Sequence, residues 1–272
     1  MGTSGAASIV RLDTVDSTQS VAFALAERGA PDRTVVVADQ QSAGRGRRGR
    51  TWRAPAGASL LASILVRPRL PQALLATLSL TTAVATAEAL RRVAPVAARV
   101  KWPNDVLVGG KKIAGILLEA RMSTGTGVSE PRRACLGPPS VDGVLTVPAT
   151  TVIGIGINLG QREFPPDLAA GATSIALETG HAPDRETMLE ALLEAFDAWR
   201  ARLEGDGFGP VRERWRALSD TLGRRVTVDA VSGVATDLDT DGALLIDVGD
   251  GTARVIAGEI SLGEEKADAA RR

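Results

Sequence analysis

The segment Gly44–Arg50, GRGRRGR, places four arginines and three glycines in seven residues. Glycines let the backbone turn sharply and expose its N–H groups, and guanidinium groups present fixed forks to carboxylate or phosphate oxygens. The whole chain has 32 basic and 32 acidic residues and no net charge, so it has no overall attraction for anions. A local loop of this composition could nevertheless bind two anions at once.

Three interpretations of this loop remain open from its residues alone. Gly44, Gly46 and Gly49 fit the dinucleotide pattern G-x-G-x-x-G, but that pattern opens directly into a helix, whereas residues 52–57 continue as loop. A basic nucleic-acid arm is the second interpretation, which the zero net charge disfavours. The third is a loop that orders over a small anionic intermediate.

The segment 101–105, KWPND, is a second candidate for chemistry. Pro103 fixes the local backbone and favours an extended Trp102. Asn104 and Asp105 would then lie at the mouth of a strand, where they could bond an adenine edge or, through Asp105, hold Mg²⁺. A β-turn that buries a tryptophan explains the same residues equally well.

Two glycine-rich segments complete the candidate site. In 109–119, GGKKIAGILLE, two lysines lead into a strand, and one could point inward at an anion; a hairpin with two solvated lysines is the alternative. In 154–159, GIGINL, alternate glycines permit the close approach of a ligand or another backbone. Asn158 could contact a base or ribose there, although a bulged core strand has the same pattern.

Apolar periodicity predicts the elements that position these motifs. We expect strands at 8–12, 34–38, 59–66, 98–101, 106–108, 113–120 and 152–158, and helices at 16–28, 74–93, 184–203 and 211–218. Short strands at 225–230, 234–238, 243–248 and 253–257, with turns at Gly233, Asp241–Gly242 and Asp250–Gly251, predict a small barrel of the SH3-like size. We expect Ser123–Thr150 to be a mobile surface loop and its Cys135 an incidental thiol.

Composition excludes several kinds of site. The chain has one cysteine and one histidine, so it has no disulfide framework, no cysteine zinc site and no multi-histidine metal site. The N-terminus lacks the features of a signal peptide, and no run of about 18 apolar residues indicates a membrane span. We therefore expect a cytoplasmic protein without a membrane partner.

The order of the motifs resembles that of the biotin–protein ligases. Asp16-Ser17-Thr18, then QQSA at 40–43 ahead of GRGRRGR, then KWPND, GKKIAGILLE and GIGIN follow one another as in the catalytic domain of that family, and GEISL at 258–262 resembles its ending. The resemblance covers about Leu12 to Gly263, nearly the whole chain. GRGRRGR followed by KWPND is highly specific to the family.

The resemblance implies a fold and a reaction. The fold is α/β (α+β): a mixed sheet with helices on one face, similar to class II aminoacyl-tRNA synthetases, at 1–220, then an SH3-like barrel at 221–263 and a tail at 264–272. The reaction uses biotin, ATP and Mg²⁺. Biotin and ATP form biotinyl-5′-AMP, and the biotinyl group then passes to a lysine of a biotin carboxyl carrier protein or domain of an acyl-CoA carboxylase.

The resemblance also implies roles for individual residues. Lys112, Arg45 and Arg47 would be catalytic, with Asp105 a weaker candidate for Mg²⁺. The biotin site would consist of Ser17, Thr18, Gln19, Gln41, Arg45, Gly46, Arg47, Lys112, Gly115 and Leu117; Gln19 stands where relatives often have Asn. The ATP or adenylate site would consist of Arg48, Arg50, Trp52, Asn104, Lys112 and Asn158. We expect the GRGRRGR loop to be mobile without ligand and to order when biotin or the adenylate binds.

Some members of this family carry an N-terminal helix-turn-helix that binds DNA. Few residues precede the first expected strand, too few for that motif, so we expect a ligase that does not bind DNA, as a monomer or weak homodimer. The alternatives are a lipoate–protein ligase, whose members do not generally show GRGRRGR followed by KWPND, a nucleic-acid-binding protein and a non-catalytic biotin-binding relative.

Overall fold

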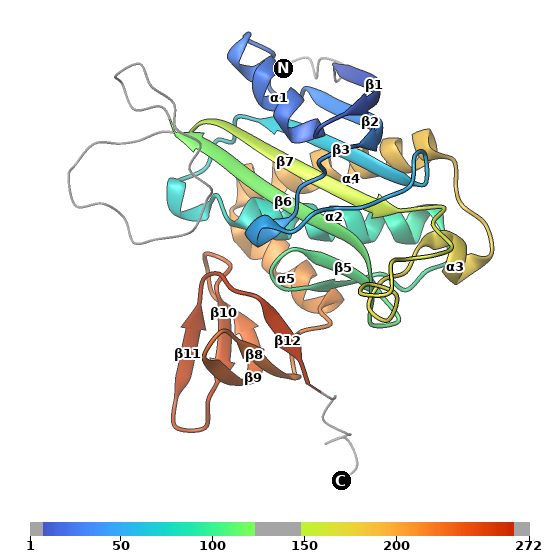
Figure 1. Cartoon of the computed structure of the whole chain (residues 1–272). Helices are drawn as coiled ribbons and strands as arrows, with labels where there is room; N and C mark the ends of the chain where they lie inside the picture. Colours follow the sequence, from blue (N-terminus) through green and yellow to red (C-terminus); the bar gives the residue numbers. More distant parts are fainter. Residues whose placement is uncertain (1–7, 123–147, 264–272) are drawn as a thin grey trace.

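The computed structural model describes residues 8–122 and 148–263, which form two β-sheets and a group of helices (Figure 1). The larger sheet consists of β1 (Ile9–Val15), β2 (Val35–Gln41), β3 (Ser59–Val66), β4 (Arg99–Lys101), β5 (Asp105–Val108), β6 (Lys111–Met122) and β7 (Pro148–Asn158). The smaller sheet consists of β8 (Arg225–Val228), β9 (Val231–Leu238), β10 (Leu244–Asp247), β11 (Thr252–Val255) and β12 (Ile260–Leu262). The helices are α1 (Thr18–Glu27), α2 (Thr77–Val93), α3 (Ile175–Thr179), α4 (Arg185–Asp206) and α5 (Phe208–Leu218), with 3₁₀ turns at Arg47–Gly49 and Gln72–Leu74.

The larger sheet has the strand order β1-β2-β3-β7-β6-β5-β4. β1 pairs with β2 in parallel, and the other neighbours are antiparallel. The expected mixed sheet is therefore confirmed. β6 and β7 lie at its centre, so the GKKIAGILLE and GIGIN segments are side by side and pair as Gly115 with Gly156.

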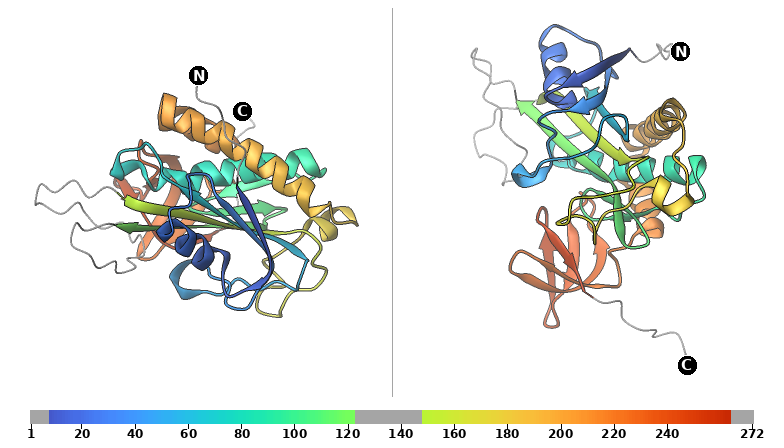
Figure 2. Two further views of the ribbon diagram at one scale, coloured as in Figure 1. Left: turned by 90° about the horizontal axis from the view of Figure 1, so that it is seen from above. Right: turned by 45° about the vertical axis from the view of Figure 1, so that its right-hand side comes forward.

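Helices cover both faces of this sheet, not one face as expected. α2 and α4 pack on one face, and α1 packs on the other (Figure 2). The reason lies in β2, where successive side chains point to opposite faces. Val35 and Val37 belong to the core with α2 and α4, while Val36 is buried in a second cluster with α1. Both faces thus need apolar cover at this end of the sheet.

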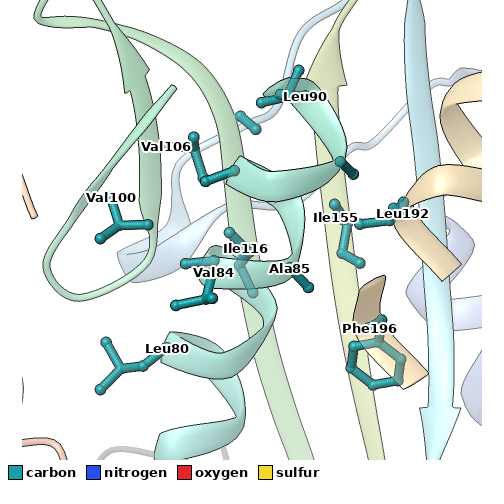
Figure 3. Packing of buried hydrophobic residues seen from close by; sticks show 14 of the residues in the cluster. Leu80, Val84, Ala85, Leu90, Val100, Val106, Ile116, Ile155, Leu192 and Phe196 are labelled. Carbon is teal, nitrogen blue, oxygen red and sulfur yellow. The ribbon is translucent and has the colours of Figure 1, made fainter. Parts of the chain in front are cut away.

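α2 is the central helix of the core. By length and composition alone, the stretch 72–93 could cross a membrane, but 72% of its apolar window is buried inside the fold. Three of its buried threonines, Thr81, Thr82 and Thr86, donate their hydroxyls to the carbonyl four residues earlier. Its apolar side chains face β5, β6 and α4 (Figure 3), so this helix packs on the face of the sheet opposite the candidate site.

The C-terminal sheet is antiparallel, with the order β11-β10-β9-β8-β12. The predicted turn at Gly233 is wrong, because Gly233 lies inside β9 and the turn falls at residues 229–230. A Cβ at Gly233 would overlap the backbone carbonyl of Asp247. The glycine therefore marks a close approach between two strands.

Several predicted elements differ in extent. The strand expected at 34–38 continues to Gln41, and β6 and β7 extend to Met122 and from Pro148, so residues 148–150 are strand and not loop. α3 and β12 were not among the predicted elements. Residues 123–147 of the expected loop, with Cys135, and the tail 264–272 lie outside the described residues, and the domain boundary at 220/221 stays a prediction.

Candidate active site

One pocket of about 310 Å³ lies on the face of the larger sheet opposite α2 and α4. Its walls come from β2, β6, β7, the start of α1, the GRGRRGR loop, the KWPND hairpin and the C-terminal end of the described chain. Every residue predicted for the site lines it: Ser17, Thr18, Gln19, Gln41, Arg45, Gly46, Arg47, Arg48, Arg50, Trp52, Asn104, Asp105, Lys112, Gly115, Leu117 and Asn158. The fold thus brings five separate motifs to one cavity.

The GRGRRGR loop folds back on itself over this pocket. The Gly46 amide donates to the Arg50 carbonyl at 2.7 Å, and Arg45 and Thr51 form an isolated β-bridge. Arg48 and Gly49 have positive φ angles, 54° and 78°, which complete the reversal. No helix begins after this turn, so the loop is not a dinucleotide-binding fingerprint.

The four arginines of the loop point to two different parts of the fold. Arg45 lies 3.3 Å from Glu119 of β6, and Arg47 donates to the Asn104 side chain at 3.0 Å. Arg48 binds Asp229 in the β8–β9 turn, and Arg50 forms an ion pair with Glu259 just before β12, both at the ends of strands of the C-terminal sheet.

The loop therefore contacts both sheets. Arg45 and Arg47 lie over the face of the larger sheet that carries the pocket, which suits direct contact with an anion. Arg48 and Arg50 connect the loop to the C-terminal sheet.

Lys112 points into the pocket, whereas its neighbour Lys111 is exposed. The Lys112 ammonium lies 2.6 Å from Asp105 Oδ1 and 5.8 Å from the centre of the Trp52 ring. The Lys112 backbone is fixed as well, because its amide donates to Gly171 and its carbonyl accepts from Thr173. One lysine of the pair is thus held over the site, as the functional interpretation of this segment predicted.

The start of α1 forms one end of the pocket. The Thr18 amide and hydroxyl both donate to Gln41 Oε1, at 2.8 and 3.1 Å, and the hydroxyl also contacts Ser63 at 2.8 Å. Gln19 donates to the Leu117 carbonyl at 3.0 Å. These buried polar groups form a fixed network of donors and acceptors, which suits a small polar ring.

Glycines form the floor of the pocket because Trp52 lies directly on it. A Cβ at Gly156 would come 2.5 Å from the indole, and one at Gly115 would come 3.1 Å from it. The glycines of GIGIN therefore allow other side chains to lie directly against the strand. The strand is paired without a register shift in this segment, so the alternative of a bulged strand is wrong. The Trp52 Nε1 atom is buried without a hydrogen-bond partner.

In the KWPND segment, one residue is buried as a structural tryptophan and another faces the pocket, so both interpretations of this segment apply. Trp102 is buried, and its indole donates at 3.1 Å to the carbonyl of Gly242, in the β9–β10 turn of the C-terminal sheet. Asn104 faces the pocket and donates to the Ile116 carbonyl at 2.7 Å. Asn158 donates to Thr173 at 3.0 Å, so its amide nitrogen is already engaged.

Some residues of the site were not predicted. Ser63, Lys101 and Phe164 contact the Thr18 network or line the pocket, together with Asp167 and Leu168. Ser63 looked like an ordinary residue of a buried strand, and the segment after GIGIN has no regular pattern. Lys101 belongs to KWPND, but no role was predicted for it. Burial lowers the pKa of its ammonium.

The described residues contain no group of three His, Cys, Asp or Glu side chains that could hold a metal ion. Asp105 is the nearest carboxylate to Lys112, and its Oδ1 atom is engaged by that lysine. Mg²⁺ is commonly held by one or two carboxylates together with substrate phosphates. This pocket fits that mode, with Asp105 as the one candidate carboxylate and the remaining ligands supplied by a bound phosphate.

Comparisons with known proteins agree with this geometry. Residues 12–129 match the Biotin/lipoate A/B protein ligase family, and residues 221–263 match the Biotin protein ligase C terminal domain. The biotin--[acetyl-CoA-carboxylase] ligase of Paracoccus denitrificans is 38% identical over 257 residues, which cover 91% of this chain and 98% of that protein.

Solved structures show the same similarity. The biotin protein ligase of Aquifex aeolicus, in complex with biotin and ATP, has a TM-score of 0.75 and 28% identity and covers 95% of this chain and 99% of its own. The Leishmania major enzyme, in complex with biotinyl-5-AMP, has a TM-score of 0.60 and 25% identity, with coverage of 92% and 99%. On these similarities and on the pocket that unites its five motifs, this chain belongs to the biotin protein ligase family.

Proposed function

We propose that this pocket carries out both half-reactions of an ATP-dependent biotin protein ligase. Biotin's carboxylate attacks the α-phosphorus of ATP, which yields biotinyl-5′-AMP and pyrophosphate. The amine of a carrier lysine then attacks the mixed anhydride and releases AMP. The observation that carries the proposal is the convergence of Lys112, Arg45 and Arg47 on one cavity.

Electrostatics explain why these cations serve the first step. A carboxylate and a triphosphate repel each other, and charge develops on the transferred phosphate. A preorganised cation or donor at such a position typically contributes about 3–4 kcal/mol to catalysis. We assign Lys112 to the position between the carboxylate and the α-phosphate, with Arg45, Gly46 and Arg47 around them. No protein nucleophile is needed.

Biotin would bind at the α1 end of the pocket. The ureido ring needs both donors and acceptors, which Ser17, Thr18, Gln19 and Gln41 can supply. Gly115 and Leu117 would form the wall beside the ring. The existing bonds of Thr18 to Gln41 and of Gln19 to Leu117 hold these side chains in place before ligand binds.

The nucleotide would bind at the other end. We assign the adenosine to Trp52, Asn104 and Asn158, with Trp52 stacking on the base and Asn158 using its free oxygen. Arg48 and Arg50 would support the loop or contact phosphates. Mg²⁺ would arrive with the triphosphate and neutralise part of its charge; Asp105 is the candidate protein ligand.

The second step requires that water be kept from the labile adenylate. The GRGRRGR loop spans the pocket and is suited to exclude water. The names of the relatives imply a biotin carrier domain of an acetyl-CoA carboxylase as the acceptor. We further propose a cytoplasmic enzyme, monomeric or weakly dimeric, that has no role in DNA binding.

The test is direct. The protein is incubated with MgATP and either biotin or lipoate, and the acyl-adenylate is measured by mass spectrometry together with released pyrophosphate. Biotin-dependent biotinyl-AMP, followed by biotin transfer to a carrier domain, is the expected result. Lipoyl-AMP alone would instead indicate a lipoate–protein ligase, the second branch of the matched family, and no adenylate would leave a binding protein.

A further inference from the structure

Lys101 adds a second lysine to the face of the sheet that carries the pocket. Its neighbour Val100 is buried in the core beside α2, as is Val106 (Figure 3). Because successive side chains of a strand alternate between faces, Lys101 points to the opposite face. The strand register supports this direction. Lys101 pairs with Asp105, and Asp105 pairs with Gly115, which forms part of the pocket floor.

The surroundings of Lys101 leave its charge poorly compensated. Burial removes much of its hydration, and the nearest acid, Asp105, is engaged 2.6 Å from the Lys112 ammonium. Among the described residues, no carboxylate forms an ion pair with Lys101; Asp105 and Asp220 attract its charge, and Lys112 and Arg224 repel it. A partly buried cation without an ion-pair partner is costly, so this position suits an anionic ligand.

The pocket as a whole has more positive charge than biotinyl-AMP requires. Seven basic and three acidic side chains line it: Arg45, Arg47, Arg48, Arg50, Arg53, Lys101 and Lys112 against Asp105, Asp167 and Glu259. Glu119 and Asp229 pair with Arg45 and Arg48 from outside the lining, so the local excess is two positive charges in a chain with no net charge. Biotinyl-AMP keeps a single negative phosphate charge, whereas biotin and ATP together bring several. The difference between the two ligand sets is pyrophosphate.

We propose that Lys101 binds the β- and γ-phosphates of ATP and stabilises the departing pyrophosphate. This inference rests on the proposed function. A biotin carboxylate oxygen forms a bond to the α-phosphorus, the bond from that phosphorus to the bridging oxygen breaks, and the electron pair stays on pyrophosphate. Lys101 lies one strand beyond Asp105 and two strands beyond Lys112, toward the C-terminal sheet, where the chain of phosphates would extend past Lys112.

The two half-reactions distinguish pyrophosphate binding by Lys101 from a general effect on the structure of the pocket, because only the first half-reaction involves pyrophosphate. The test variants are Lys101→Gln and the charge-conserving Lys101→Arg. Lys111→Gln is the matched control, since it removes the same charge from an exposed side chain that does not line the pocket. The forward assay measures the KM for ATP, and the reverse assay measures ATP formed from biotinyl-AMP and inorganic pyrophosphate.

In Lys101→Gln we expect the KM for ATP and the half-saturating pyrophosphate concentration to rise by at least about tenfold. Single-turnover transfer from added biotinyl-AMP to a carrier domain should stay within about twofold of wild type, which also shows that the variant is folded. Lys101→Arg should recover most of the loss. The inference is overturned if Lys101→Gln slows both half-reactions equally, or changes neither while the wild type forms biotinyl-AMP. A wild type that forms no adenylate would reject the proposed function itself.

Discussion

The Lys112 ammonium lies 2.6 Å from Asp105 Oδ1 across the β5–β6 pair. This pair holds the cation over the pocket floor, where a Cβ on Gly115 would come 3.0 Å from the ammonium. Lys112→Ala should therefore slow biotinyl-AMP formation by roughly 10²–10³. Lys111→Ala, which removes the adjacent exposed lysine, should change the rate little; equal losses in the two variants would contradict the assignment.

Asp105 can be a Mg²⁺ ligand, a partner of Lys112, or both. Because its Oδ1 atom already lies against an ammonium, we expect the second role to dominate. Asp105→Asn should reduce the rate of adenylation but leave the half-saturating Mg²⁺ concentration unchanged. A Mg²⁺ titration of both proteins measures this, and a large rise in the Mg²⁺ requirement would instead make Asp105 a metal ligand.

The ion pairs Arg48–Asp229 and Arg50–Glu259 connect the loop to the C-terminal sheet. All four side chains are about half exposed, so the pairs should contribute little to global stability, about 0–1 kcal/mol each. Their expected effect is local order in the loop. Asp229→Asn combined with Glu259→Gln should increase amide hydrogen exchange in residues 44–52 with little change in the melting temperature.

Removal of the exposed Arg92–Glu194 pair on α2 and α4 is the matched control and should leave that exchange unchanged. Addition of biotin should slow exchange in the wild-type loop if the loop orders on binding. If hydrogen exchange in the loop changes neither in the double variant nor on addition of biotin, the expected mobility of the loop is contradicted.

Trp102 connects the KWPND hairpin to the C-terminal sheet through its bond to the Gly242 carbonyl. Trp102→Phe should lower the free energy of unfolding, because it leaves that buried carbonyl unsatisfied at a cost of about 1–3 kcal/mol beyond the lost volume. Trp215→Phe is the control, since Trp215 is equally buried and its Nε1 has no partner. Denaturant unfolding should show the larger loss for Trp102→Phe, and equal losses would exclude a role for the hydrogen bond.

Asp184 begins α4 as its N-cap. Bonds from the Thr187 amide and hydroxyl hold the pKa of this carboxyl below its usual value. A depressed pKa stabilises the fold above the unfolded-state pKa, near 3.9, and this contribution is lost as pH falls through the lower folded-state value. Asp184→Ala should therefore lower the melting temperature at pH 7 by more than at the lowest pH at which the protein remains folded.

Asp184→Asn keeps an oxygen that can accept the cap bond but does not titrate. Its melting temperature should lie between those of the wild type and Asp184→Ala at pH 7. A difference between wild type and Asp184→Ala that is constant with pH would mean that the charge of Asp184 contributes nothing.

The sequence by itself determined the family, the chemistry and most of the elements. Local patterns sufficed because glycine spacing, β-branched runs and cap residues act within a few positions of the chain. The five motifs were recognisable in order, and each predicted residue lines the same pocket. What a motif could not reveal was the choice between its alternatives, as for Trp102 or the glycines of GIGIN.

Only the tertiary structure decided those choices, because each depends on contacts distant in sequence. Gly156 must be glycine because Trp52 lies on it, and Gly233 because β10 passes close by. α1 covers the second face of the sheet because both faces of β2 are apolar. Lys101 faces the pocket because its neighbour Val100 is buried in the core and successive side chains of a strand alternate between faces.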